Sequence, residues 1–248
     1  MNIVVCVSQT PDTTTKIQVG SDGKHIDPTG VKFILNPYDE FAVEEGLKLR
    51  EANGGAVTLL CVGNDSAKEN IRLGLAMGAD KAILVKDEAK GDSFSVASQL
   101  ADVLKELGPD MILFGRQSID YDSAQMGPTV AELLDLPVIT FVTNLQIDGT
   151  SIKAERDIEG GKEVVVASLP CVITAQKGLN EPRYPKLPDI MKAKSKPIEE
   201  RAGTAPSLRV ETVALHKPEQ KGSGKVLDGT PEGVKELVRL LREEAKVI

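Results

Sequence analysis

The sequence predicts an α/β fold in which helices cover both faces of a parallel sheet. Up to about residue 145, short runs of Val, Ile and Leu alternate with longer amphipathic segments. Continuous aliphatic runs are typical of strands buried on both faces, and their alternation with helices is typical of a parallel sheet. Hydrophobic residues make up 41% of the 248 residues but aromatic residues only 3%, so we expect an aliphatic core.

Strands and helices are expected to alternate along this part of the chain. The expected strands are residues 3–7, 57–62, 82–85, 111–114 and 138–142. The expected helices lie around residues 39–52, 66–78, 92–108 and 123–135. Ser66 and Glu69 have the spacing of a capping box, and Asp92 is placed to cap the following helix. Because crossovers between parallel strands are right-handed, these elements predict a Rossmann-like sheet.

The pattern changes after residue 145. Short strands separated by Asp-Gly and Gly-Gly turns predict an antiparallel meander up to residue 177. Residues 178–230 are rich in Pro, Lys and Glu and are expected to form an extended arm. Thr230 and Pro231 then open a last helix, residues 231–248, whose apolar stripe packs either on its own domain or on a partner subunit. We therefore divide the chain into residues 1–177, 178–230 and 231–248.

Composition excludes several kinds of protein. The net charge is −7, which disfavours a nucleic-acid surface or an anionic membrane surface. No apolar run reaches the length of about 18 residues that a membrane helix needs, and the first ten residues read as a strand rather than a signal peptide. We expect a cytoplasmic protein without direct membrane insertion. The three cysteines, each in an aliphatic run, are expected to be buried core residues.

The loops at the carboxyl ends of the strands are the expected ligand site of such a sheet. They span residues 8–16, 63–66 and 115–129, and none has the glycine pattern of a dinucleotide or P-loop site. The loop 115–129 carries small and polar residues before a helix, a pattern that suits a phosphate. The alternative is a plain polar loop with Asp122 as the helix N-cap. We expect no catalytic residues and no metal site, because no nucleophile–base set or ligand cluster emerges.

The arm carries apolar side chains among prolines, notably Tyr184, Leu187, Ile190 and Met191. Apolar residues that proline stiffens lose little entropy on docking, which favours a recognition element. Four lysines, at positions 186, 192, 194 and 196, add local positive charge that would attract an acidic partner. The alternative is a solvated charged segment that covers its own sheet.

Five segments of the chain are distinctive: NPYDEFAVEEGLKLRE (36–51), RLGLAMGADKA (72–82), GRQSIDYDSAQMGP (115–128), RDIEGG (156–161) and LPCVITAQKGLNEPRYPKLPDIMKAKSKP (169–197). Together, and in this order, they resemble the β subunit of electron transfer flavoproteins. The resemblance implies a fold of the adenine nucleotide α-hydrolase type. It also implies a heterodimer with an α subunit that holds most of the FAD, while this chain binds AMP. Such a carrier, rather than an enzyme, takes electrons from dehydrogenases, typically the acyl-CoA dehydrogenases of fatty acid β-oxidation. It passes them to a quinone reductase and the respiratory chain.

The resemblance also assigns residues. The implied AMP contacts are Cys6, Asn36, Pro37, Tyr38, Asp39, Val62, Gly115, Arg116, Gln117, Ser118, Ile119, Asp120, Tyr121, Asp122, Ser123, Ala124, Gln125 and Met126. The implied flavin contacts are Tyr38 and Thr13, the latter where some relatives have an aromatic residue. The implied docking residue is Leu187, with Tyr184, Pro185, Pro188, Ile190 and Met191 around it.

Other functions remain open at this stage. Some members of the family bind a second FAD in place of AMP and bifurcate electrons between two acceptors. Ser8 replaces a common lysine, and Tyr121 stands where relatives carry Asp or Gly, which affects the nucleotide pocket. An alternative of another class is a stand-alone adenine-nucleotide-binding module.

Overall fold

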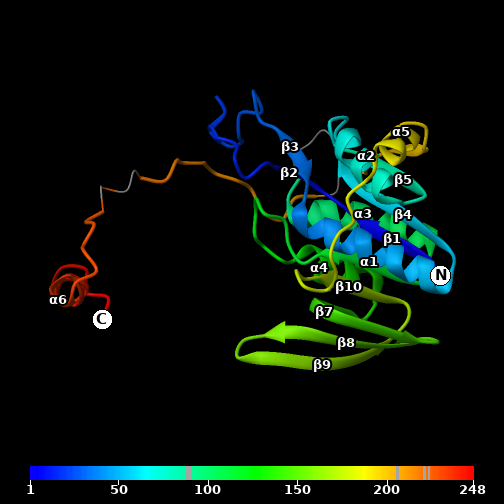
Figure 1. Ribbon diagram of the computed structural model, residues 1–248. Helices are drawn as coiled ribbons and strands as arrows, with labels where there is room; N and C mark the ends of the chain where they lie inside the picture. The colour runs from blue at the N-terminus through cyan, green and yellow to red at the C-terminus, as the bar shows by residue number, and fades with distance from the viewer. Residues whose placement is uncertain (88–90, 205–206, 220–221, 223) are drawn as a thin grey trace.

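The computed structural model describes residues 1–87, 91–204, 207–219, 222 and 224–248. Its centre is a nine-stranded sheet in the order β11-β5-β4-β1-β6-β10-β7-β8-β9 (Figure 1). The strands of this sheet are β1 (Asn2–Cys6), β4 (Ala56–Gly63), β5 (Lys81–Lys86), β6 (Met111–Gly115), β7 (Val138–Asp148), β8 (Ser151–Ile158), β9 (Gly161–Ser168), β10 (Cys171–Ala175) and β11 (Ile198–Ala202). A separate two-stranded sheet pairs β2 (Gln9–Pro11) with β3 (Phe33–Leu35).

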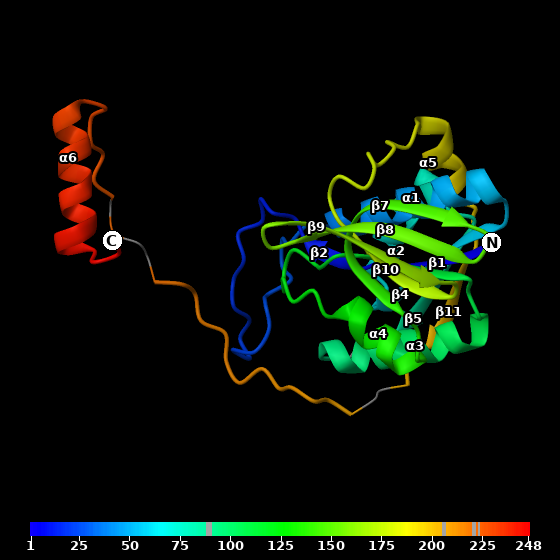
Figure 2. The same ribbon diagram turned by 90° about the horizontal axis from the view of Figure 1, so that it is seen from below.

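Helices cover both faces of the parallel part, as predicted. The covering helices are α1 (Pro37–Asn53), α2 (Ala67–Met77), α3 (Ser93–Leu107) and α4 (Met126–Leu134). Two further helices follow, α5 (Leu187–Ala193) and α6 (Pro231–Arg239), and α6 continues into the π-helical turn η1 (Leu240–Glu244). Successive residues of β1 face opposite sides: Ile3 lies in the core under α1 and α2, and Val4 in the core under α3 and α4. Figure 2 shows the two helix layers on either side of the sheet. The α/β fold class is confirmed.

The order of the strands determines at which edge of the sheet a ligand is expected to bind. Chain order runs outward from β1 through β4 to β5, and then crosses back to β6 on the other side of β1. All these neighbours are parallel, so their carboxyl ends share one edge of the sheet. The switch in direction lies between β1 and β6, the place where such sheets bind ligands.

The meander is one strand shorter than predicted. β7, β8 and β9 are antiparallel, but β10 lies between β6 and β7 and is parallel to both. Assigning residues 171–177 to the meander was therefore wrong. All five residues of β10 are buried, the continuous pattern of a central parallel strand rather than the alternation of a meander strand.

Part of the expected extended arm is regular structure. Within residues 178–230, α5 packs on α2, and β11 pairs in parallel with the edge strand β5. After β11 the chain leads to α6, which stands apart from the sheet in both views (Figures 1 and 2). The side chains of Val234, Leu237 and Val238 on α6 remain exposed.

Helix ends agree with the sequence in part. The carboxylate of Asp92 accepts a hydrogen bond from the Ser95 N–H, and the hydroxyl of Thr230 accepts one from the Gly233 N–H, as expected of N-caps. Ser66, by contrast, makes no capping bond to α2, because its hydroxyl bonds the side chains of Gln9 and Asn64. The predicted capping box was wrong.

All three cysteines are free thiols in the core, as predicted. In the part of the chain that the structure describes, no helix has both the length and the apolar character needed to cross a membrane.

Candidate functional site

Asp39 is the centre of the polar site at the switch point. Its carboxylate accepts hydrogen bonds from the Ser8 N–H at 2.8 Å and the Ser8 O–H at 3.0 Å, just after β1. The Asn36 side-chain N–H donates to it at 2.9 Å, and the Gly115 N–H at the end of β6 donates at 3.2 Å. One side chain in the first turn of α1 therefore ties the two strands that flank the switch point.

Burial governs the chemistry of these groups. Loss of water around the carboxyl of Asp39 raises its pKa to about 7, against the opposing effect of the hydrogen bonds from Asn36, Ser8 and Gly115. Burial also raises the pKa of the Cys6 thiol well above its ordinary value, and the charge of Asp39 adds to this effect. Cys6 is therefore a protonated, unreactive thiol at the end of β1.

Asn36 fixes the first half of the loop after β6. Its side-chain N–H also donates to the Gln117 carbonyl at 2.9 Å, and its side-chain oxygen accepts from the Ile119 N–H at 3.3 Å. At Gly115 the backbone of α1 comes so close that a Cβ atom would lie 2.4 Å from the Asp39 Oδ1 and 2.6 Å from the Tyr38 carbonyl carbon. Only glycine fits there.

The second half of the loop exposes backbone donors. Asp122 and Ala124 adopt left-handed φ angles of 56° and 51°, and the Gln117 side chain donates to the Asp122 carboxylate. In the described part of the chain, the N–H groups of Ser123, Ala124 and Gln125 have no hydrogen-bond acceptor. These donors lie at the N-terminus of α4, where backbone N–H groups and the helix dipole favour an anion.

Helix α4 begins later than predicted. It starts at Met126 rather than near residue 123, with Gln125 as its N-cap. Asp122 lies outside the helix with a left-handed backbone, so the alternative in which it is the N-cap was wrong.

Arg116, at the start of the same loop, lies between two aromatic rings. Its guanidinium carbon is 4.9 Å from the centre of the Tyr38 ring and 5.6 Å from that of Phe141. Its buried Nε atom has no hydrogen-bond partner among the described residues. Arg116, Phe141 and Arg156 also line an open hollow of ≈ 430 Å³ above the start of the meander.

The structure brings the nucleotide residues assigned by resemblance to one edge. Cys6 ends β1, Val62 lies near the end of β4, residues 36–39 begin α1, and residues 115–126 connect β6 to α4. Thr13 lies in an exposed turn after β2. Sequence reasoning missed the role of Ser8, although a polar residue directly after the first buried strand was the available signal.

The proposed docking residues lie on a different part of the surface. Leu187 opens α5 and is 73% exposed, and Tyr184 is 95% exposed. Ile190 and Met191 are exposed on the same short helix. We refer to these four exposed side chains, all within residues 184–191, as the docking patch, because clustered exposed apolar side chains are candidates for an interaction surface.

The comparisons with known proteins agree with this architecture. The family model described as the electron transfer flavoprotein domain matches residues 24–206. The electron transfer flavoprotein subunit beta of Bacillus subtilis (strain 168) is 45% identical, and that of Bradyrhizobium diazoefficiens is 40% identical, each over 100% of both chains. The Protein FixA of Azorhizobium caulinodans is 40% identical over 78% of this chain and 72% of its own length. The chain therefore belongs to the electron transfer flavoprotein family, among its β subunits.

Proposed function

We propose that this chain pairs with an α subunit to form a heterodimeric electron carrier. In this proposal the α subunit holds most of the FAD, and this chain binds AMP in a structural role. The heterodimer takes electrons from dehydrogenases, typically acyl-CoA dehydrogenases, and passes them to a quinone oxidoreductase and the respiratory chain. We also propose that the heterodimer is cytoplasmic, as expected from the sequence.

The observation that carries the nucleotide part is the polar edge between β1 and β6. The backbone donors of Ser123, Ala124 and Gln125 and the buried Nε of Arg116 lack partners in the described residues, so they fit an anionic ligand such as a phosphate. Asn36 and Asp39 hold the loop and α1 in place around that ligand. AMP would then be held by residues that also join three elements of the fold.

The flavin supplies the redox chemistry, and this chain supplies part of its surroundings. Tyr38 lies in the first turn of α1, with the Arg116 guanidinium 4.9 Å from the centre of its ring, and this contact supports a fixed ring beside the proposed nucleotide site. We assign Tyr38 as the main flavin contact and Thr13 as a secondary flavin contact. The exposed stripe of α6 is proposed to pack on the α subunit, because an apolar helix face is stabilised by a partner.

The apolar patch on α5 is the proposed docking surface for the donor dehydrogenase. Leu187 is its central side chain, with Tyr184, Ile190 and Met191 around it. A small and transient contact suits a carrier that must meet several partners in turn.

The experiment is co-expression with the α subunit, purification of the complex and analysis of the nucleotides that denaturation releases. We expect a yellow heterodimer that releases FAD and AMP in equal amounts. Release of FAD at twice that proportion without AMP would instead support the bifurcating form. A stable, colourless monomer in the presence of the α subunit would overturn the proposal and favour a stand-alone nucleotide-binding module.

A further inference from the structure

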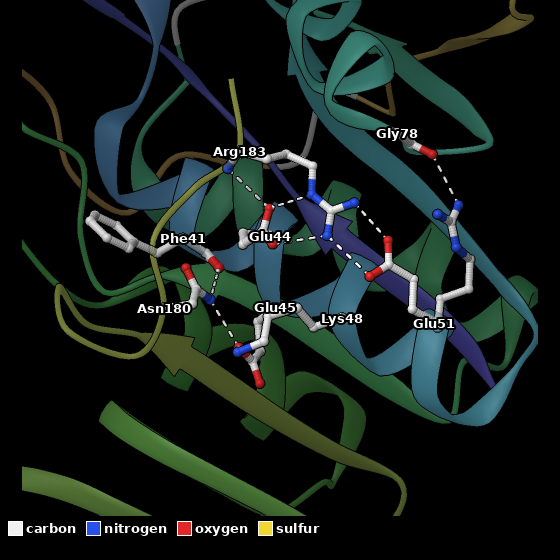
Figure 3. Close-up of polar contacts among 9 residues, drawn as sticks. Phe41, Glu44, Glu45, Lys48, Glu51, Gly78, Asn180 and Arg183 are labelled. Carbon is white, nitrogen blue, oxygen red and sulfur yellow. Dashed lines mark hydrogen bonds and ion pairs between the residues drawn. The ribbon is translucent and has the colours of Figure 1, made fainter. Parts of the chain in front are cut away.

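Arg183 joins the base of the docking patch to α1. Its Nε donates to the Glu44 carboxylate at 2.7 Å and its Nη2 donates at 2.9 Å, so the guanidinium forms a fork with that side chain. Its Nη1 donates to the Glu51 carboxylate at 2.6 Å. Figure 3 shows the guanidinium between the two carboxylates, which project from the same side of α1.

The backbone is held as well as the side chain. The Arg183 N–H donates to the Glu44 carboxylate at 3.1 Å. Three residues earlier, the Asn180 side-chain N–H donates to the Glu45 carboxylate at 2.9 Å and to the Phe41 carbonyl at 3.0 Å. The chain is therefore fixed on α1 over one short stretch immediately before the exposed patch begins (Figure 3).

Burial of Glu44 makes this attachment costly to break, because loss of Arg183 would leave a buried carboxylate without its charged partner. The Glu44 side chain is only 7% exposed, and a carboxylate so far from water needs a charged partner. The hydrogen bonds with Glu44 and Glu51 raise the pKa of Arg183 above its ordinary value. A forked guanidinium–carboxylate contact also fixes orientation, which a lysine in the same place would not do.

The far end of the patch has its own attachment. The Arg72 guanidinium donates to the carbonyls of Ala193 and Lys196, each at 2.6 Å. The Lys196 ammonium donates to the Leu75 and Ala79 carbonyls near the end of α2. Between the two attachments the segment spans a hollow of ≈ 300 Å³ bordered by the end of α2 and by α5.

We propose that Arg183 is a positioning residue for partner docking: its contacts with Glu44 and Glu51 hold the first end of segment 184–192, so that Leu187 is presented in a preset place. The inference rests on the proposed function, in which Leu187 contacts the donor. An exposed segment that is already ordered loses less entropy on binding, and this gain appears as affinity. Arg183 itself need not touch the partner.

The test uses the complete heterodimer and steady-state electron transfer from the donor dehydrogenase. Arg183→Gln is expected to raise the KM for the donor about fivefold to tenfold with kcat unchanged, because the ordering cost then falls on binding. FAD and AMP content should be unchanged. Arg183→Lys should recover only part of the affinity, since an ammonium cannot form the fork.

Two further variants keep the test independent of folding defects. The double variant Glu44→Gln/Arg183→Gln removes both charges, leaves no unpaired buried carboxylate, and should show the same rise in KM. Arg201→Gln is the matched control, because Arg201 also bridges two carboxylates, those of Glu106 and Glu199, but on β11 away from the patch. It should leave the KM unchanged.

Leu187→Ala distinguishes the positioning role of Arg183 from the docking function of Leu187. If Leu187→Ala raises the KM and the Arg183 variants do not, the positioning role is wrong while the docking function stands. If Leu187→Ala has no effect, the docking function itself fails. An equal rise in KM for Arg201→Gln would also overturn the inference, because general surface charge would then explain the effect.

Discussion

The nucleotide edge and the docking patch hold their functional groups by opposite means. At the edge, the buried carboxylate of Asp39 receives hydrogen bonds from Ser8, Asn36 and Gly115, which follow or end three different strands. At the patch, Leu187 and Tyr184 are exposed on a segment that Arg183 and Arg72 fix at its two ends and whose helix, α5, packs on α2. The groups at the nucleotide edge are therefore held by contacts that the core of the fold requires. The side chains of the patch are held by contacts on the surface of that core.

Because of this difference, we expect variants at the edge to affect the stability of the chain and variants at the patch to affect partner binding. A change at the edge disturbs the joints between β1, α1 and β6 and should lower the free energy of unfolding. A change at the patch removes a contact that the folded chain does not need, so its effect should fall on the partner. The predictions below test this separation, from the largest expected effect to the smallest.

Gly115→Ala should have the largest effect. The new Cβ would lie 2.4 Å from the Asp39 Oδ1 and 2.7 Å from the Asp39 backbone nitrogen, and neither the buried carboxylate nor the helix backbone can give way. We expect the free energy of unfolding to fall by about 4 kcal/mol, measured by urea unfolding. Gly161→Ala is the control, since a Cβ there meets no atom within 4 Å. Equal stability of the two variants would contradict the close contact at Gly115.

Asp39 should make stability depend on pH. Its folded pKa of about 7 lies above the ordinary value of 3.8, so between these values the native state keeps a proton that the unfolded chain releases. The resulting stabilisation is complete below pH 4 and is lost as the pH rises through 7. Between pH 4 and pH 7.5 we expect a loss of about 3 kcal/mol that Asp39→Asn does not show. The check is urea unfolding of both proteins across this range, and parallel pH profiles would contradict it.

Leu187→Ala should have the smallest effect on stability. The side chain is 73% exposed, so the free energy of unfolding should change by no more than about 0.5 kcal/mol. In the heterodimer the same change should weaken electron transfer from the donor dehydrogenase. A clear loss of stability would mean that the patch contributes to the core. The expected division between effects on stability and effects on partner binding would then be wrong.

Sequence patterns predicted the elements better than their order. Aliphatic runs located the strands of the parallel sheet other than its edge strand β11, but nothing in the run CVITA specifies that β10 inserts between β6 and β7. Strand order depends on long-range packing, which a local pattern does not contain. The α5–β11 segment was missed because its prolines and lysines obscure the short helix and strand within it.

The sequence predicted where the candidate site lies and which residues belong to it, but it did not predict the hydrogen bonds that connect those residues. The loop after β6 and the start of α1 were both expected near the ligand. The hydrogen bonds that Asp39 accepts from Ser8 and Gly115 were not, because they join residues 31 and 76 positions apart in the chain. The role of Arg183 was missed for the same reason: its carboxylate partners lie more than 130 residues away.

The most direct test of the separation is the adenine nucleotide released from three purified heterodimers: wild type, Asn36→Ala and Leu187→Ala. Asn36 ties the nucleotide loop to α1 through Gln117 and Ile119, so its loss should release the loop. FAD content serves as the control for an intact complex. We predict AMP equimolar with the protein in the wild type and in Leu187→Ala, and a clear deficit in Asn36→Ala. Full AMP content in Asn36→Ala, or loss of AMP in Leu187→Ala, would contradict the separation of the two regions.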